Sequence, residues 1–204
     1  MSEATAPHSG LVGVLLAAGF GRRYAAAAGD VDKLLQPMAD GLPLVVRAAT
    51  ALRAALPDSV AVVRPDSSSE LVARLSEGGL QVVVAPAAAG GMAYSLAAAV
   101  MARPSASAWL VALADMPWIR GETIARVAAA VTATTLAAPC HAGRRGHPVA
   151  FGAAYRDELL LLTGDHGARE VLQRHAKHLR LVEVNDPGIL ADVDTPADRL
   201  SNRP

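Results

Sequence analysis

Short apolar runs alternate with helix-like segments over the first two thirds of the chain. The runs are rich in Val, Leu and Ala, and the segments between them place apolar residues three and four positions apart, the spacing of one helix face. The pattern predicts strands over residues 11–17, 59–65, 80–86 and 108–114, and helices over residues 43–56, 68–78, 91–103 and 121–131. Strands that are apolar throughout and separated by helices are typical of a parallel sheet covered on both faces.

The last third of the chain has a different pattern. Two apolar runs, LAAPCH and HPVAFG, flank the turn AGRRG, which indicates a hairpin. Helices are expected near residues 155–161 and 167–176, a strand over 179–184, and a final helix within 192–200. We therefore predict a Rossmann-like, doubly wound α/β fold with a mostly parallel sheet and an antiparallel C-terminal addition.

Length and composition agree with one domain and an aliphatic core. The 204 residues are 52% hydrophobic but only 3% aromatic, which favours aliphatic packing of helices on a sheet. No linker of domain-boundary length interrupts the pattern. We expect a single domain over residues 11–201, after a disordered tail at residues 1–10.

Charge and cysteine content argue against several classes of function. Nineteen basic residues balance nineteen acidic ones, so a broad nucleic-acid-binding surface is not expected. The apolar stretches are too short or too interrupted to span a membrane, and the first residues lack the pattern of an export signal. Cys140 is the only cysteine, which excludes an intrachain disulfide and favours a cytoplasmic protein.

The stretch LLAAGFGRRYAAAAGDVDKLL, residues 15–35, joins the first strand to a glycine-containing turn. A dinucleotide-binding loop requires G-x-G-x-x-G, and here Tyr24 stands where the third glycine belongs. A P-loop requires Gly-Lys-Ser/Thr at its end, whereas Lys33 has no glycine or hydroxyl residue beside it. Both of these phosphate-binding motifs are therefore incomplete.

A triphosphate-binding turn fits the same stretch better. Residues 17–19 and Gly21 are small, so backbone N–H groups can close around phosphate oxygens. Arg23 and Lys33 then supply two cations for a strongly anionic group. An ordinary strand-to-helix turn with a solvated Arg and Lys is the alternative that these residues leave open.

Three carboxylates are candidates for binding Mg²⁺, which proteins commonly hold through one or two carboxylates together with substrate phosphates. Asp115 follows the strand predicted at 108–114, and open α/β sheets bind ligands at that edge. Asp192 and Asp194 stand two positions apart, so in an extended segment both side chains point to the same face. The alternatives are a turn or cap role for Asp115 and a helix cap at Asp194 or Thr195.

Three further turns carry candidate binding residues. Gly91 opens a helix that contains Ser95, so free N–H groups and a hydroxyl are expected to face the nucleotide at the same edge as the first loop. In AGRRGHPVAFG, Arg145 and His147 are candidates for contacting an anionic acceptor, and a solvated basic turn is the alternative. Asp165 is a third candidate for contacting the acceptor, although it is more simply explained as the cap of the next helix.

Six motifs follow one another between residues 11 and 200. They are LAAGFGRR with the later DKLL, GGMAYSL, LADMP, GRRGHPVAFG, GDHGARE and DVDTPADRL. In this combination the chain resembles the molybdenum-cofactor nucleotidyltransferases, within the wider superfamily of nucleotide-diphospho-sugar-like transferases. The elements LAAG, GHPV and GDHGAR are similar to those of the cytidylyltransferase branch of that family.

The resemblance implies Mg²⁺-dependent transfer of CMP from CTP to the phosphate of a molybdopterin-type acceptor, with release of pyrophosphate. A transient contact with a molybdenum hydroxylase or its chaperone is also expected. Arg23, Lys33 and Asp115 would take part in catalysis, and Asp115 would bind Mg²⁺, shared with Asp192 or Asp194. The nucleotide triphosphate would be bound by Leu16, Ala17, Ala18, Gly19, Gly21, Arg23 and Lys33.

Two departures from the family pattern and several alternatives accompany this resemblance. An alanine-rich insert between Tyr24 and Lys33 replaces a short glycine-containing link, and Ala93 stands where the family often has glycine.

GTP-dependent guanylyl transfer to the same pterin and nucleotidyl transfer to another small phosphate are the nearest alternative functions. A non-catalytic cofactor carrier or maturation chaperone, and a NAD-dependent dehydrogenase, are the alternatives from other classes.

Overall fold

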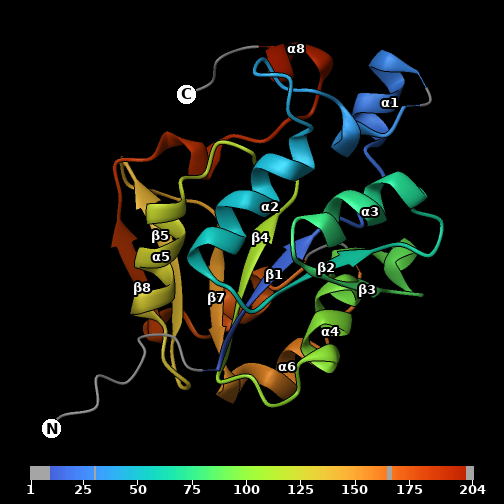
Figure 1. Cartoon of the computed structure of the whole chain (residues 1–204). Coiled ribbons are helices and arrows are strands. Elements are labelled where there is room, and N and C mark those ends of the chain that lie inside the picture. Colours follow the sequence, from blue (N-terminus) through green and yellow to red (C-terminus); the bar gives the residue numbers. More distant parts are fainter. Residues whose placement is uncertain (1–9, 30, 165–166, 201–204) are drawn as a thin grey trace, which may run out of the picture.

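A mixed eight-stranded sheet forms the centre of the structure (Figure 1). The computed structural model describes residues 10–29, 31–164 and 167–200. Residues 1–9, most of the predicted disordered tail, therefore lie outside the described residues, and so does Asp165. The strands are β1 (Leu11–Leu16), β2 (Ser59–Val63), β3 (Gln81–Val84), β4 (Ala108–Leu113), β5 (Leu136–His141), β6 (Arg144–Arg145), β7 (Val149–Gly152) and β8 (Leu179–Glu183).

The order of the strands confirms a doubly wound sheet. The sheet runs β3-β2-β1-β4-β7-β5-β6, with β8 paired to β5. Strands β1 to β4 are mutually parallel, and β1 pairs with β4 from Leu11↔Ala108 to Leu16↔Leu113. The chain moves outward from β1 to β3 and then returns to the other side of β1, so the winding reverses between β1 and β4. Ligands of open α/β sheets bind at the carboxyl edge at such a reversal.

The antiparallel part of the sheet is narrower than the sequence indicates. The predicted hairpin forms, but its second arm is split: β6 pairs with β5 next to the turn, and β7 lies antiparallel between β4 and β5. Strand β8 runs parallel to β5 instead of extending the antiparallel part. Only β6 and β7 therefore oppose the direction of the other described strands.

Helices cover both faces of the sheet, as predicted, and each face has its own aliphatic core. Leu52, Leu75 and Val127 pack on one face and come from helices α2, α3 and α5. Leu96, Leu159 and Leu172 pack on the other and come from α4, α6 and α7. The helices are α1 (Arg22–Ala28), α2 (Leu44–Ala55), α3 (Ser69–Glu77), α4 (Met92–Ala102), α5 (Gly121–Ala130), α6 (Arg156–Leu160), α7 (Arg169–Arg174) and α8 (Pro196–Leu200).

The alanine run that the sequence marks as an insert forms most of helix α1. Alanine has the highest helix propensity, and Gly21 and Gly29, both with positive φ, flank the helix. Tyr24 anchors α1 because its side chain is buried in the core. Figure 1 shows α1 and α8 next to each other beyond the upper end of the sheet. Among the described helices, none has the length and apolar character needed to cross a membrane.

Candidate active site

The loop after β1 and the turn after β4 meet at the carboxyl edge of the sheet. Backbone hydrogen bonds fix both segments: Ala17 N donates to Val62 O at 2.9 Å, and Ala114 N donates to Leu16 O at 3.0 Å. A pocket of about 370 Å³ opens there. It is lined by Leu16, Ala17, Ala18, Gly19, Phe20, Gly21, Arg22, Arg23, Tyr24, Lys33, Leu34, Ala88, Ala89, Gly91, Met92, Ser95, Leu113, Ala114, Asp115 and Asp194.

The glycine loop offers unused hydrogen-bond donors to this pocket. Gly21 has φ +59°, a conformation that glycine adopts without strain, and it turns the chain into α1. Within the described part of the chain, the N–H groups of Ala18, Gly19, Phe20 and Gly21 have no acceptor. Consecutive free N–H groups in a tight turn form a concavity that binds anions. The loop thus has the form predicted for phosphate binding.

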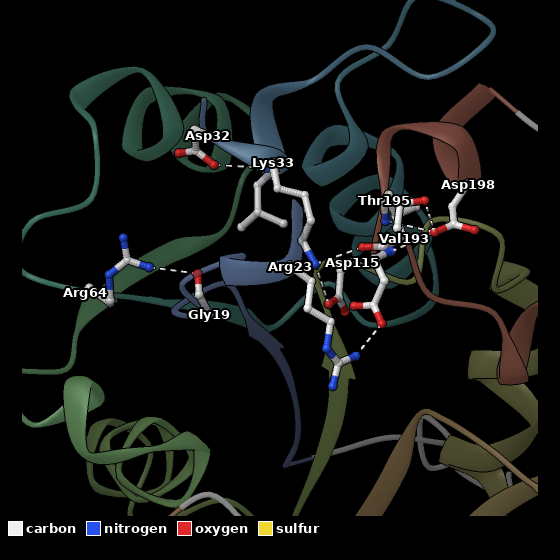
Figure 2. Close-up of polar contacts among 11 residues, drawn as sticks. Gly19, Arg23, Asp32, Lys33, Arg64, Asp115, Val193, Thr195 and Asp198 are labelled. Carbon is white, nitrogen blue, oxygen red and sulfur yellow. Dashed lines mark hydrogen bonds and ion pairs between the residues drawn. The ribbon is translucent and has the colours of Figure 1, made fainter. Parts of the chain in front are cut away.

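Lys33 reaches the centre of the site despite the preceding insert. Its ammonium donates to Asp115 Oδ2 at 2.8 Å and to the carbonyl of Val193 at 2.9 Å (Figure 2). Only 11% of the Lys33 side chain is exposed. The position is reinforced by Asp32, whose carboxylate accepts the N–H of Leu34 in the short 3₁₀ turn Lys33–Leu35. The insert therefore leaves Lys33 in the pocket, beside Asp115.

Arg23 forms a second cation–carboxylate pair at the mouth of the pocket. Its guanidinium donates to Asp194 Oδ2 at 2.5 Å, although 80% of the Arg23 side chain is exposed. An exposed pair of this kind contributes little to folding stability. Arg23 can therefore change partner at low cost when an anionic ligand arrives.

The C-terminal segment brings its carboxylates toward Asp115 through the backbone. Val193 N donates to Asp115 O at 2.9 Å, so the two flanking aspartates lie near the turn after β4. The pKa of Asp192 is raised by desolvation of its carboxyl and then by the charges of Asp194 and Asp115. The three carboxylates are therefore close enough to interact electrostatically.

A divalent cation is compatible with this region, but the protein alone does not assemble a full ligand set. In the described residues, no three His, Cys, Asp or Glu side chains form a group able to hold a metal ion. Asp115 and Asp194 are each paired with a cation. Carboxylate oxygens are nevertheless the donors that Mg²⁺ uses when substrate phosphates complete its coordination. The residues therefore fit a metal that arrives together with a phosphate ligand.

A second, more apolar pocket of about 220 Å³ adjoins the first and shares Leu16, Met92 and Leu113 with it. Arg145 and His147 both line this second pocket, so two of the residues predicted to contact the acceptor lie together. Burial lowers the pKa of the His147 imidazole, so this ring is neutral at pH 7. Its Nδ1 is buried and has no hydrogen-bond partner among the described residues. An unpaired buried polar atom is unfavourable in a folded protein.

The start of helix α4 has fewer free backbone N–H groups than the sequence predicts. Gly91 and the buried Ser95 line the first pocket, as predicted. The N–H of Ala93, however, donates to the carbonyl of Gly164 at 3.2 Å. Part of the start of α4 is therefore committed to the neighbouring loop and not available to a ligand.

The family model of the "MobA-like NTP transferase domain" matches residues 13–179. The match covers most of the chain and includes the glycine loop, Lys33 and Asp115. The chain belongs to the MobA-like NTP transferase family. Its fold and the position of its pocket agree with a nucleotidyltransferase of this family.

The relatives of this MobA-like chain carry different names. "Nicotine blue oxidoreductase" of Paenarthrobacter nicotinovorans is 29% identical over 91% of this chain and 92% of its own length. A solved Mycobacterium tuberculosis Rv0371c homologue from Mycobacterium sp. strain JC1 is 26% identical, covers 94% of this chain and 93% of that chain, and has a TM-score of 0.77. Rv0371c of M. tuberculosis H37Rv, solved as a complex with manganese, is 26% identical over 85% of this chain and 87% of that chain, with a TM-score of 0.69.

Two features of this MobA-like site were not predicted from the sequence. Arg64, just after β2, donates to the carbonyl of Gly19 at 2.7 Å. Asp198 accepts the N–H groups of Asp194 and Thr195 at 3.2 and 2.8 Å (Figure 2). The start of α8 thus uses a carboxylate from inside the helix, while the side chain of Asp194 turns to Arg23. The acidic residue three positions after Thr195 was the available signal for Asp198.

Proposed function

We propose that this protein transfers CMP from CTP to the terminal phosphate of a molybdopterin-type acceptor and releases pyrophosphate. One observation carries the proposal: Lys33 projects its ammonium between Asp115 and Val193, in a pocket that also presents the free N–H groups of the glycine loop. This arrangement suits a triphosphate whose charge must be bound and then released. The choice of CTP rests on the likeness of LAAG, GHPV and GDHGAR to the cytidylyltransferase branch.

The chain's own groups would bind and orient the triphosphate. The loop N–H groups would donate to its phosphate oxygens, and Lys33 and Arg23 would leave their aspartates to neutralise the β- and γ-phosphates. An oxygen of the acceptor phosphate would then attack the α-phosphorus as the bond to the bridging oxygen of pyrophosphate breaks. That attacking oxygen is already ionised at neutral pH, so positioning and charge stabilisation would account for most of the catalysis.

Mg²⁺ is the proposed metal, with Asp115 as its ligand and Asp192 or Asp194 as a second. A bound divalent cation would supply charge neutralisation on the phosphate oxygens. The proposal is supported by the electrostatic interaction of these carboxylates with one another and by the complex of the relative Rv0371c with manganese. We expect chelation with EDTA to remove activity and added Mg²⁺ to restore it.

The second pocket is the proposed site for the pterin. Its apolar walls, including Met92 and Phe151, suit a flat heterocycle, and His147 lines the same pocket. Arg145 stands at the same pocket with a charge suited to the acceptor phosphate. The continuity of the two pockets would place the acceptor phosphate beside the α-phosphate of the nucleotide.

Pyrophosphate release with each of the four nucleoside triphosphates, with and without molybdopterin and Mg²⁺, tests this function. We expect release only with both substrates and fastest with CTP. Preference for GTP would replace cytidylyl by guanylyl transfer. Binding of molybdopterin without pyrophosphate release from any nucleotide would instead favour a cofactor carrier or maturation chaperone.

An oxidoreductase is the second candidate, and the 29% identity to nicotine blue oxidoreductase is the observation that favours it. The glycine loop argues against it, because Tyr24 is buried where a dinucleotide loop needs its third glycine. Oxidation of NADH or NADPH by the purified protein with nicotine blue as acceptor separates the two candidates. Turnover in that assay without nucleotidyl transfer would establish the oxidoreductase.

A further inference from the structure

Arg64 lies just after β2 and reaches back to the glycine loop, although it is not among the residues that line the pocket. Its Nη1 donates to the carbonyl of Gly19 at 2.7 Å and to that of Ala18 at 3.4 Å. In Figure 2, Gly19 lies between Arg64 and the group formed by Lys33 and Asp115. Arg64 therefore contacts the glycine loop from outside the site.

The guanidinium of Arg64 is held in position by its own neighbours. Its Nε donates to Asp66 Oδ1 at 2.9 Å, and its backbone N–H donates to Ser67 Oγ at 3.1 Å. The guanidinium also lies 4.5 Å from the centre of the Phe20 ring, and Arg22 lies 5.1 Å from the same ring. With 19% of its side chain exposed, Arg64 is a preorganised donor to the loop and not a freely solvated charge.

Holding the two carbonyls also sets the direction of two N–H groups. In a trans peptide the C=O and N–H bonds point in opposite directions. The carbonyl of Ala18 shares its peptide with the N–H of Gly19, and the carbonyl of Gly19 shares its peptide with the N–H of Phe20. Both N–H groups lack an acceptor among residues 10–29, 31–164 and 167–200. Arg64 thus turns two free donors away from itself.

Among the described residues, side-chain packing does not restrain Gly19. A Cβ built at Gly19 would meet no atom within 4 Å, and glycine is free to adopt many backbone conformations. Gly19 and Phe20 are also both exposed. Without the contact to Arg64, the two peptides are expected to rotate and lose their common direction.

We propose that Arg64 is a positioning residue that presents the N–H groups of Gly19 and Phe20 to the phosphates of the nucleotide. The inference rests on the proposed nucleotidyl transfer and names the residue that shapes the phosphate-binding loop from behind. Arg64 acts through the backbone of the loop and does not touch the ligand. Its loss therefore weakens phosphate binding while every group that contacts the phosphate is still present.

The test compares Arg64→Met with Arg53→Met, using tripolyphosphate as a probe that has the phosphate chain but no base. Arg53 is a matched control because its Nε donates to the carbonyl of Gly79 at 3.0 Å, outside the pocket. We expect Arg64→Met to bind tripolyphosphate about 10- to 100-fold more weakly by calorimetry, and Arg53→Met to bind as the wild type does. In the free Arg64→Met protein, the ¹⁵N–¹H amide resonances of Gly19 and Phe20 are expected to shift.

Either of two results with Arg64→Met would overturn the proposal: wild-type affinity, or weaker binding with unmoved amide resonances of Gly19 and Phe20. Arg64→Lys keeps the charge but cannot hold Gly19, Asp66 and Phe20 together, so we expect it to be impaired as well. Wild-type binding by Arg64→Lys would show that charge alone suffices and would also overturn it. If the wild type binds tripolyphosphate as expected but releases no pyrophosphate from any nucleotide, the proposed function fails and the role of Arg64 stands.

Discussion

Each of the two basic side chains proposed to bind the nucleotide is paired with a carboxylate. Lys33 is bonded to Asp115, and Arg23 is bonded to Asp194. A buried lysine without a partner would carry a large desolvation cost, which the neighbouring carboxylate offsets. The same aspartates would become available to a divalent cation once phosphate oxygens took over the two basic side chains. Nucleotide binding and metal binding are therefore expected to support each other.

Asp115→Ala tests the role of the aspartate after β4. We expect loss of turnover by at least about a thousandfold, because Lys33 loses its partner and the proposed metal loses a ligand. The variant is expected to stay folded by circular dichroism but with a lower midpoint of thermal unfolding, because Lys33 keeps only the carbonyl of Val193 as an acceptor. Asp58→Ala is a suitable control, because Asp58 pairs with Arg103 outside the pocket. Near-normal turnover in Asp115→Ala would show that this aspartate is not essential.

His147 is expected to make stability depend on pH. Burial lowers the pKa of this imidazole in the folded protein, so the unfolded chain binds a proton that the folded chain does not. The free energy of unfolding should therefore fall as the pH drops below about 6.5, the ordinary pKa of histidine. In His147→Gln the dependence between pH 5.5 and 7.5, measured by urea unfolding, is expected to be weaker. If the free energy of unfolding changed with pH equally in the wild type and in His147→Gln, His147 would not be the cause of the dependence.

Among the secondary-structure elements, the strands that are buried on both faces are predicted best, because nearly all of their residues are apolar. Strands β1, β2 and β4 are buried almost throughout, so their apolar runs are unmistakable. The placement of β7 between β4 and β5 depends on pairing partners, and nothing in its four residues specifies them. The alanine run of α1 stands out in the sequence as an insert in the family pattern, although alanine itself favours the helix that forms there.

Asp186 joins the start of α5 to the C-terminal segment and is expected to matter for stability. This buried carboxylate accepts the Arg120 and Gly188 N–H groups and the Thr123 hydroxyl. We expect Asp186→Ala to lower the free energy of unfolding by about 2–4 kcal/mol, since buried donors would lose their acceptor. Asp157→Ala, at a side chain that is 88% exposed, should change it by less than about 0.5 kcal/mol. Urea unfolding measures the free energy of unfolding of both variants, and equal losses would contradict the stabilising role of Asp186.

At the scale of the whole molecule, the site combines parts of the chain that are far apart in sequence. The glycine loop, Lys33, Asp115 and the segment around Asp194 meet because the winding of the sheet reverses between β1 and β4. The sequence predicted these residues from motifs at a sheet edge. It did not predict their partners, because contacts such as Arg23 to Asp194 and Arg64 to Gly19 follow from the fold and leave no local pattern.

Transfer of a label from the α-phosphorus of CTP to a molybdopterin-type acceptor is the direct test of the proposed cytidylyl transfer. With Mg²⁺, the wild type is expected to label the acceptor and release an equal amount of pyrophosphate. Lys33→Ala should be slower by one to three decades, which corresponds to about 2–4 kcal/mol of lost transition-state stabilisation. Failure of the wild type to transfer label, with the other three nucleotides equally inactive, would contradict nucleotidyl transfer, and an unchanged rate in Lys33→Ala would contradict the role of Lys33.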